Sequence, residues 1–267
     1  MTTISLASLS AEQLRALCEL RGHDVSEEPW ASLSMNELGD DDRRLVAFFT
    51  AKNLSASATA MNESTVWARV IYPLLLLAEV RDVKAWSQVA LSATMPAPHG
   101  GEALTLTGVV DGVLAPESPL RGTPDLPYLL VVETKRGMDA SDPRPQLLGA
   151  ILAAAIVRRT DAARAVTQYG CYTVGDVWTF VCAEVAMPTP EARPKVELRW
   201  SREYAERHEA DTILKGKKDP TCKGTLTGAQ LAGLQDDLEL QARAGRRFGQ
   251  RMLAEPGREV ARGPGTP

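Results

Sequence analysis

Two segments determine the architecture of the protein, namely Leu104–Leu114 (LTLTGVVDGVL) and Tyr128–Lys135 (YLLVVETK). Both are apolar and dense in β-branched residues, which predicts two buried strands. Each strand nevertheless carries charge, since Asp111 lies in the first and Glu133 and Lys135 lie near the end of the second. A charged group within an apolar strand costs free energy unless it meets a partner or water. If the two strands are neighbours, two carboxylates and one ammonium converge at one edge of the sheet.

The chemistry of this trio follows from its residue types. Side chains alternate along a strand, so Glu133 and Lys135 point to one face. Two carboxylates with open coordination positions suit a hard cation such as Mg²⁺ or Mn²⁺ and leave room for waters and a phosphate oxygen. A lysine beside that ion can hold or deprotonate an attacking water. The ordinary alternative is an edge-strand ion pair between Glu133 and Lys135, with Asp111-Gly112 in a turn.

The elements around the two strands predict an α/β fold with helical additions at both ends. On the N-terminal side the expected elements are helices at 10–20, 36–52 and 62–80 and a strand at 86–93. On the C-terminal side they are a helix at 146–158, a hairpin at 169–185 and a strand at 195–200. Pro73 predicts a kink or an early stop in the third helix. Gly175-Asp176 predicts a type II′ turn in the hairpin.

Changes in composition divide the chain into four expected segments. These are a helical N-terminal cap at 1–54, a core domain at 55–200, a helical extension at 201–254 and a Gly/Pro/Arg-rich tail at 255–267. The extension includes a long helix at about 227–253, and the tail is expected to be disordered.

Composition excludes several classes of protein. With 30 Lys+Arg against 34 Asp+Glu, the 267-residue chain has a formal charge of −4, which excludes a generic polycationic coat for nucleic acid. The four cysteines form no CxxC pair, so a disulfide scaffold or zinc ribbon is not expected. The longest apolar run, at 70–80, is far too short to span a bilayer. Because the first residues show no signal-peptide pattern, we expect a cytoplasmic protein with no membrane partner.

The order of the motifs resembles the PD-(D/E)XK nuclease superfamily. VVD(111)G is followed by a loop, by VVE(133)TK(135) on the next strand, by a helix and by the hairpin YGCYTVGDVWTF. The resemblance covers about residues 60–200 and implies a restriction-endonuclease-like fold, in which helices flank a central mixed sheet. Val110 stands where the motif has a proline, a departure that the superfamily often tolerates.

The resemblance implies a role for each residue of the site. Asp111 and Glu133 would ligate Mg²⁺ or Mn²⁺, with the backbone carbonyl of Thr134 as a third ligand. Lys135 would position the attacking water. Glu63, on the helix before the sheet, would support a second metal or bind through water. An acid in the first turn of a helix also stabilises the helix dipole, so this structural role for Glu63 stays open.

Other residues carry weaker signals. Gln146 begins the helix after the lysine strand, where RecB-like members carry a catalytic glutamine, but Ala150 stands where those members have a tyrosine. The alternative for Gln146 is that it only starts its helix after Pro145. Candidate phosphate contacts are Arg136, Lys215, Lys217 and Lys218. Four tryptophans occupy positions that are typical of a core rather than of base stacking: Trp67, Trp86, Trp178 and Trp200.

The sequence thus predicts a metal-dependent nuclease that hydrolyses phosphodiester bonds, with DNA as the preferred substrate. Two alternatives stay open. One is a catalytically silent nuclease fold that serves as a binding or assembly module. The other is a bacterial restriction or antiviral-defence effector that acts only as a homodimer or with an activating partner protein. The near-neutral charge favours this effector, because affinity for nucleic acid would then come from the assembly.

Overall fold

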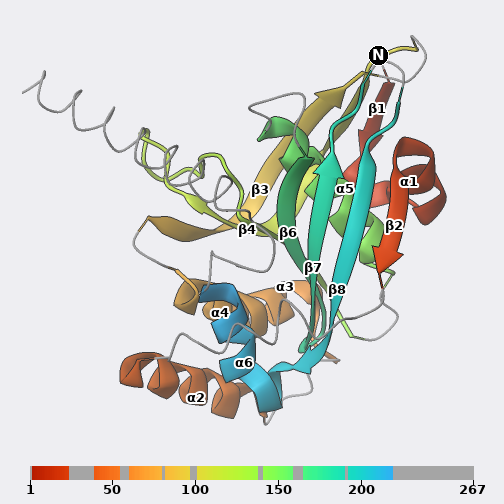
Figure 1. Cartoon of the computed structure of the whole chain (residues 1–267). Helices are drawn as coiled ribbons and strands as arrows, with labels where there is room; N and C mark the ends of the chain where they lie inside the picture. The colour runs from red at the N-terminus through yellow and green to blue at the C-terminus, as the bar shows by residue number, and fades with distance from the viewer. Residues whose placement is uncertain are drawn as a thin grey trace, which may run out of the picture. The chain divides into compact units, whose positions relative to one another are not determined.

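The computed structural model describes residues 2–23, 39–54, 60–79, 82–96, 101–137, 141–158, 165–189 and 192–218 (Figure 1). All of them belong to one compact unit that spans residues 1–221. No helix in the described ranges is long and apolar enough to cross a membrane.

A mixed sheet of eight strands forms the centre of this unit. The strands are β1 (Thr2–Ser5), β2 (Glu19–His23), β3 (Val83–Met95), β4 (Leu104–Pro116), β5 (Leu130–Lys135), β6 (Ala165–Val174), β7 (Val177–Ala186) and β8 (Lys195–Ala205). Their order is β1-β4-β5-β6-β7-β8-β2, and β3 pairs with β4 off this path. The β1/β4, β5/β6 and β2/β8 pairs are parallel and the others are antiparallel. The predicted α/β class, with a mixed sheet flanked by helices, is confirmed.

The pairing of β4 decides where the charged residues meet. β3 pairs with β4 along its whole length. β1 and β5 share the other edge, because β1 pairs with residues 104–107 of β4 and β5 pairs with residues 112–114. Asp111 therefore lies immediately beside the short stretch where β4 and β5 are hydrogen-bonded.

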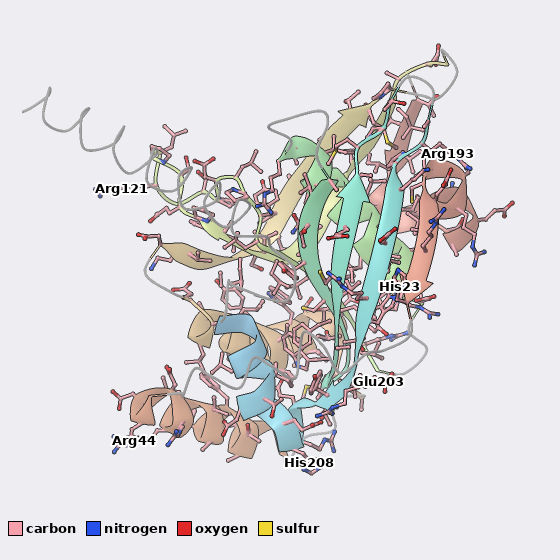
Figure 2. All side chains as sticks on the ribbon, in the orientation of Figure 1. His23, Arg44, Arg121, Arg193, Glu203 and His208 are labelled. Carbon is pink, nitrogen blue, oxygen red and sulfur yellow. The ribbon has the colours of Figure 1, made fainter. Side chains whose placement is uncertain are left out.

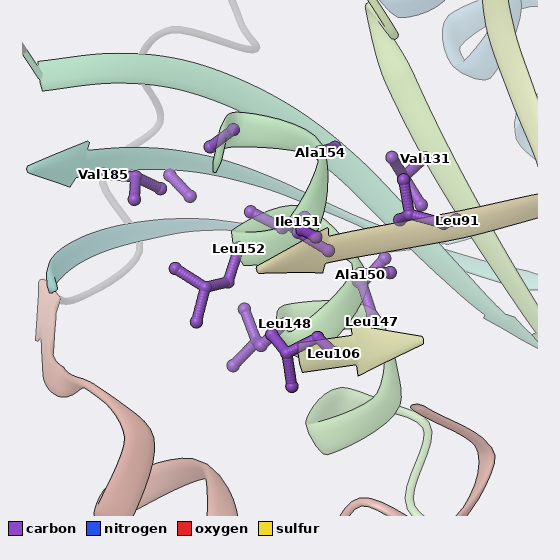
Figure 3. Close-up of a cluster of buried hydrophobic side chains, with 14 of the residues drawn as sticks. Leu91, Leu106, Val131, Leu147, Leu148, Ala150, Ile151, Leu152, Ala154 and Val185 are labelled. Atoms are coloured by element: carbon purple, nitrogen blue, oxygen red, sulfur yellow. The ribbon is translucent and has the colours of Figure 1, made fainter. Parts of the chain in front are cut away.

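The first core lies between the sheet and α5 (Arg144–Val157), the helix that connects the parallel strands β5 and β6. Ten residues of α5 are buried, because η1 (Leu6–Ser8) and α1 (Ala11–Leu17) cover the side of the helix that the sheet leaves free. Figure 3 shows this core around Leu147, Leu148, Ile151 and Leu152 of α5, with Leu91, Leu106 and Val131 from the strands. The all-round apolar helix expected after β5 is thus explained by contacts on more than one side.

The second core contains α2 (Asp40–Leu54), α3 (Glu63–Val66), the π-helical segment η4 (Trp67–Ile71), α4 (Tyr72–Leu77) and α6 (Glu206–Lys218). β5 contributes to both cores, since Val131 belongs to the first while Leu130 and Val132 belong to the second. A strand apolar on both faces is typical of such a layered arrangement.

The helix irregularity predicted at Pro73 is present. Proline has no N–H, so the carbonyl of Arg69, four residues earlier, loses its usual helical donor. The side-chain amide of Asn53 on α2 donates to that carbonyl at 2.9 Å. The π-helical segment ends at Ile71, two residues before Pro73, and the hydrogen bond to the Arg69 carbonyl ties α2 to the following helices.

The N-terminal segment differs from the expected helical cap. α1 begins at a capping box formed by Ser10 and Gln13, as the serine cap predicts. However, β1 and β2 precede and follow it and join the sheet at opposite ends of its order. These strands of four and five residues are defined by pairing with β4 and β8, so no local periodicity signals them.

The C-terminal boundary also differs from the predicted one. β8 continues to Ala205, beyond the core boundary expected at residue 200. The hairpin turn agrees with its prediction, because Gly175 has a φ of +62° at the first central position. The long helix expected at about 227–253 and the tail at 255–267 lie outside the described residues.

Candidate active site

β4 and β5 bring the predicted trio together. The register pairs Gly112 with Val132, so Asp111 and Glu133 lie opposite each other one step further along. There the N–H of Thr134 donates to Asp111 Oδ2 at 2.7 Å. The carboxylate of Asp111 thus acts as the acceptor that a backbone carbonyl would otherwise supply, and it joins the two strands where their ladder ends.

Glu133 is the most deeply buried charged side chain of the trio. Its side chain is 1% exposed, and its Oε1 accepts a hydrogen bond from Lys135 Nζ at 2.5 Å. Its Oε2 is buried and has no hydrogen-bond partner among the described residues. A buried carboxylate oxygen without a partner is costly and needs an explanation.

The environment of Glu133 changes its protonation. Burial, the largest cause, and the negative charge of Asp111 raise the pKa of Glu133 to about 7, against the opposing effect of the hydrogen bond from Lys135. Glu133 is therefore poised between its neutral and ionised forms near neutral pH.

The pKa values of the other two members of the trio are also shifted. Burial raises the pKa of Asp111, against the opposing effects of the Thr134 N–H and the charge of Lys135. Burial acts to lower the pKa of Lys135, but the ion pair with Glu133 outweighs it and the net pKa is raised. Lys135 is thus an ammonium donor, which suits orienting a water or a phosphate oxygen rather than removing a proton.

Gln88 on β3 belongs to this site, although no motif or pattern around it predicts this role. Its Nε2 donates to Asp111 Oδ1 at 3.2 Å. Its φ is +54°, a left-handed conformation that costs a non-glycine residue roughly 1–2 kcal/mol. The flanking residues Ser87 and Val89 are paired with β4, so the strain is confined to the one residue beside Asp111. Strain of this kind concentrates at functional sites.

Glu63 lies near the trio and is also in the position of a helix-dipole acid. It is the first residue of α3, after the Asn62 cap, and it is exposed. Its negative charge contributes to raising the pKa of both Glu133 and Lys135, which places it beside the trio. Both roles considered for Glu63 therefore agree with its location.

The remaining predicted site residues are not brought into the trio by any described contact. Gln146 lies half-buried in the first turn of α5, and within the described residues no hydrogen bond joins it to Asp111, Glu133 or Lys135. Arg136 is exposed just beyond the end of β5. The side chains of Lys215, Lys217 and Lys218 lie outside what the structure describes.

The described residues contain no group of three Asp, Glu, His or Cys side chains placed to hold a metal ion. His23 lies on β2 and His208 on α6, well separated in Figure 2, and His99 is outside the described ranges. What the site offers a cation is the pair of carboxylates on Asp111 and Glu133.

No protein-family model matches the chain, and a search of curated proteins finds no match either.

Proposed function

We propose that the chain is a metal-dependent nuclease with a restriction-endonuclease-like fold, and that it hydrolyses phosphodiester bonds, preferably in DNA. One observation carries the proposal. Asp111, Glu133 and Lys135 converge from two hydrogen-bonded strands, and Glu133 keeps a buried oxygen without a partner. The element order also supports the proposal. Helices come first, the antiparallel strands β3, β4 and β5 follow, and the crossover helix α5 then leads to β6, which is parallel to β5.

The donor set fits a hard divalent cation. Mg²⁺ is commonly bound through one or two carboxylates, with waters and substrate phosphates completing its shell, so a third acidic ligand is not required. Asp111, Glu133 and the carbonyl of Thr134 would hold the ion, with Glu63 in reach through water. The unpaired Oε2 of Glu133 supports this assignment, since a cation would supply its missing partner. When bound, the ion would polarise the phosphate and lower the pKa of a water.

The chain's own residues have separate tasks in this proposal. The Thr134 N–H and Gln88 fix the Asp111 carboxylate from two sides. Lys135, held protonated by its ion pair, orients the attacking water and offsets negative charge that develops on the phosphate. Burial of Glu133 keeps bulk water from its carboxylate, which strengthens its interaction with any positive charge.

Cleavage assays test the proposal directly. Supercoiled plasmid and single-stranded oligonucleotides are incubated with the protein in Mg²⁺, Mn²⁺ or EDTA. We expect metal-dependent cutting that Lys135→Ala reduces by at least about a hundredfold. Lys84→Ala is the matched control, because Lys84 is an exposed lysine paired with Glu79 outside the site, and it should leave cutting unchanged.

Two results would contradict the proposal. Full cleavage activity in Lys135→Ala would show that the proposed mechanism is wrong. A folded wild type that cuts no substrate, and whose melting temperature does not rise with Mg²⁺ or Mn²⁺, would identify the chain as a binding or assembly module instead.

A further inference from the structure

A cavity of about 540 Å³ lies beside the trio on the same face of the sheet. Glu133 of β5 pairs with Tyr172 of β6, and Tyr172 pairs with Thr179 of β7. Paired residues share a face of the sheet, so Glu133 lies next to Tyr172, which lines the cavity. The volume is in the range of small-ligand pockets.

Two aromatic rings form part of the wall. Tyr172 and Trp200 lie with their ring centroids 6.0 Å apart at an interplanar angle of 66°, and both side chains are half-exposed. Within the described residues neither the Tyr172 hydroxyl nor the Trp200 indole N–H has a hydrogen-bond partner. The cavity therefore offers flat apolar surface together with two free polar groups, which is the combination that a nucleobase requires.

Thr179 also lines the cavity. Its residue is 4% exposed, and its Oγ1 is buried without a hydrogen-bond partner in the described structure, as are the Oγ1 atoms of Thr134 in β5 and Thr173 in β6.

The cavity wall carries both signs of charge, from Arg15, Arg144 and Arg202 and from Asp142 and Glu203. Arg144 is held in a bidentate pair with Asp142, and Arg202 is paired with Glu209. Arg15, on α1, is exposed and has no ion-pair partner among the described residues. Arg15 is thus the cation of the wall that remains free to contact an anionic group.

We propose that this cavity binds one unpaired nucleotide next to the phosphodiester bond at Asp111, Glu133 and Lys135, so that the substrate is single-stranded nucleic acid or an unpaired strand end. The inference rests on the proposed nuclease function. A base inside a duplex is stacked on both sides and cannot enter a walled cavity unless it leaves the stack. An unpaired base can stack on Trp200 or Tyr172 while its phosphate meets Arg15.

The binding test separates stacking from chemistry. Anisotropy of a short labelled single strand, of DNA and of RNA, is measured in EDTA on the Lys135→Ala protein and on the same protein with Trp200→Leu or Trp200→Phe. We expect Trp200→Leu to weaken binding about tenfold, the effect of losing one stacked base, and Trp200→Phe to keep most of the affinity because it keeps a ring. Duplex binding should not change. A loss of affinity for single-stranded DNA or for single-stranded RNA supports the proposal.

A charge variant covers the case in which Trp200→Leu does not fold. Arg15→Ala alters an exposed side chain and should weaken single-strand binding several-fold, whereas Arg44→Ala, an exposed arginine on α2 outside the cavity, should not. Unchanged affinity in a folded Trp200→Leu protein, or in Arg15→Ala, overturns the proposal.

The outcomes also distinguish the cavity from the catalytic site. If the wild type binds single strands through Trp200 but cuts nothing with any metal, the nuclease function fails and the cavity assignment stands. If the wild type cuts, but Trp200→Leu binds and cuts single strands as the wild type does, the cavity assignment fails and the nuclease function stands.

Discussion

Glu133 and Glu206 are both buried glutamates, exposed by 1% and 3%, yet their carboxylates are held in different ways. Glu206, at the start of α6, accepts a hydrogen bond from the buried Trp178 indole at 3.0 Å, and no buried oxygen of Glu206 lacks a partner in the described structure. Glu133 has one oxygen bonded to Lys135 and one without a partner. The carboxylate of Glu206 therefore joins α6 to the sheet, whereas Glu133 retains one carboxylate oxygen that can bind a ligand.

The contrast separates a structural acid from a candidate functional one by a physical criterion. Both glutamates bear the cost of burial, but the described contacts of Glu133 offset it at one oxygen only, whereas no buried oxygen of Glu206 lacks a partner in the described structure. The difference should appear as opposite responses of activity and stability to equivalent substitutions.

The largest expected difference is in cleavage. Glu133→Gln keeps the shape of the side chain but removes the negative charge that would hold a cation, so we expect metal-dependent cutting to fall by at least about a hundredfold. Glu206→Gln should leave the rate within about threefold, because the carboxylate of Glu206 is bonded to Trp178, which is not a residue of the trio. Initial rates on the preferred substrate measure both. Equal losses in the two variants would show that the distinction is wrong.

The next effect is on the pH dependence of stability without metal. The folded pKa of Glu133 is about 7 against an ordinary 4.5, so the folded state binds the proton more tightly than the unfolded state does. Glu133 therefore contributes a loss of stability as pH rises from about 4.5 to about 7, by about 3 kcal/mol at most. Urea unfolding in EDTA at pH 5 and pH 8 measures this loss.

Glu133→Gln is the control for that measurement, since it cannot ionise. It should flatten the pH dependence between pH 5 and pH 8 and be more stable than the wild type at the higher pH. An unaltered slope in Glu133→Gln would mean that other groups are responsible.

A smaller effect is expected at the structural glutamate. Trp178→Phe removes the indole donor and leaves Glu206 Oε2 buried without it, so the free energy of unfolding should fall by about 1–3 kcal/mol. Trp86→Phe is the matched change, because the Trp86 indole donates to the neutral Ala115 carbonyl in a less buried place. Its loss should be smaller. Thermal melting of both variants measures the difference, and the reverse ranking would contradict it.

The smallest expected change is at Gln88. Gln88→Gly relieves a left-handed backbone conformation, which should stabilise the fold by up to about 1 kcal/mol. It also removes the hydrogen bond to Asp111, so we expect cleavage to fall several-fold. Stability and activity would then move in opposite directions. A variant that loses both would show that Gln88 acts only through the fold.

Much of the fold was predictable because its signals are local. β4, β5 and α5 follow from apolar composition and periodicity, and the β6–β7 turn follows from Gly175. β1 and β2 were not predictable, since their few residues form strands only through partners far along the chain.

The candidate site divides in the same way. Asp111, Glu133 and Lys135 stand out because charge is unusual in an apolar strand, and the structure brings them together. Gln88 does not stand out in this way, because polar residues are ordinary in a strand where polar and apolar residues alternate. Its role depends on its left-handed backbone conformation. Trp200 was predicted from its strand position to belong to the core, and it packs against the first core, but it also lines a cavity whose walls come from several elements. Sequence patterns reveal charged residues in an apolar strand, because these are unusual there. They do not reveal ordinary residues that only tertiary contacts bring to a site.

The location of β1 and β2 has a consequence for synthesis of the protein. Thr2 pairs with Leu104 and Glu19 pairs with Lys195, so β1 and β2 can pair only after β4 and β8, which lie much further along the chain, have been synthesised. Contacts so distant along the chain slow folding, because a long loop must close before any pairing is gained. Since Leu6 and Leu14 also complete the cover of α5, the sheet that carries the candidate site becomes fully packed only after β8 has been translated.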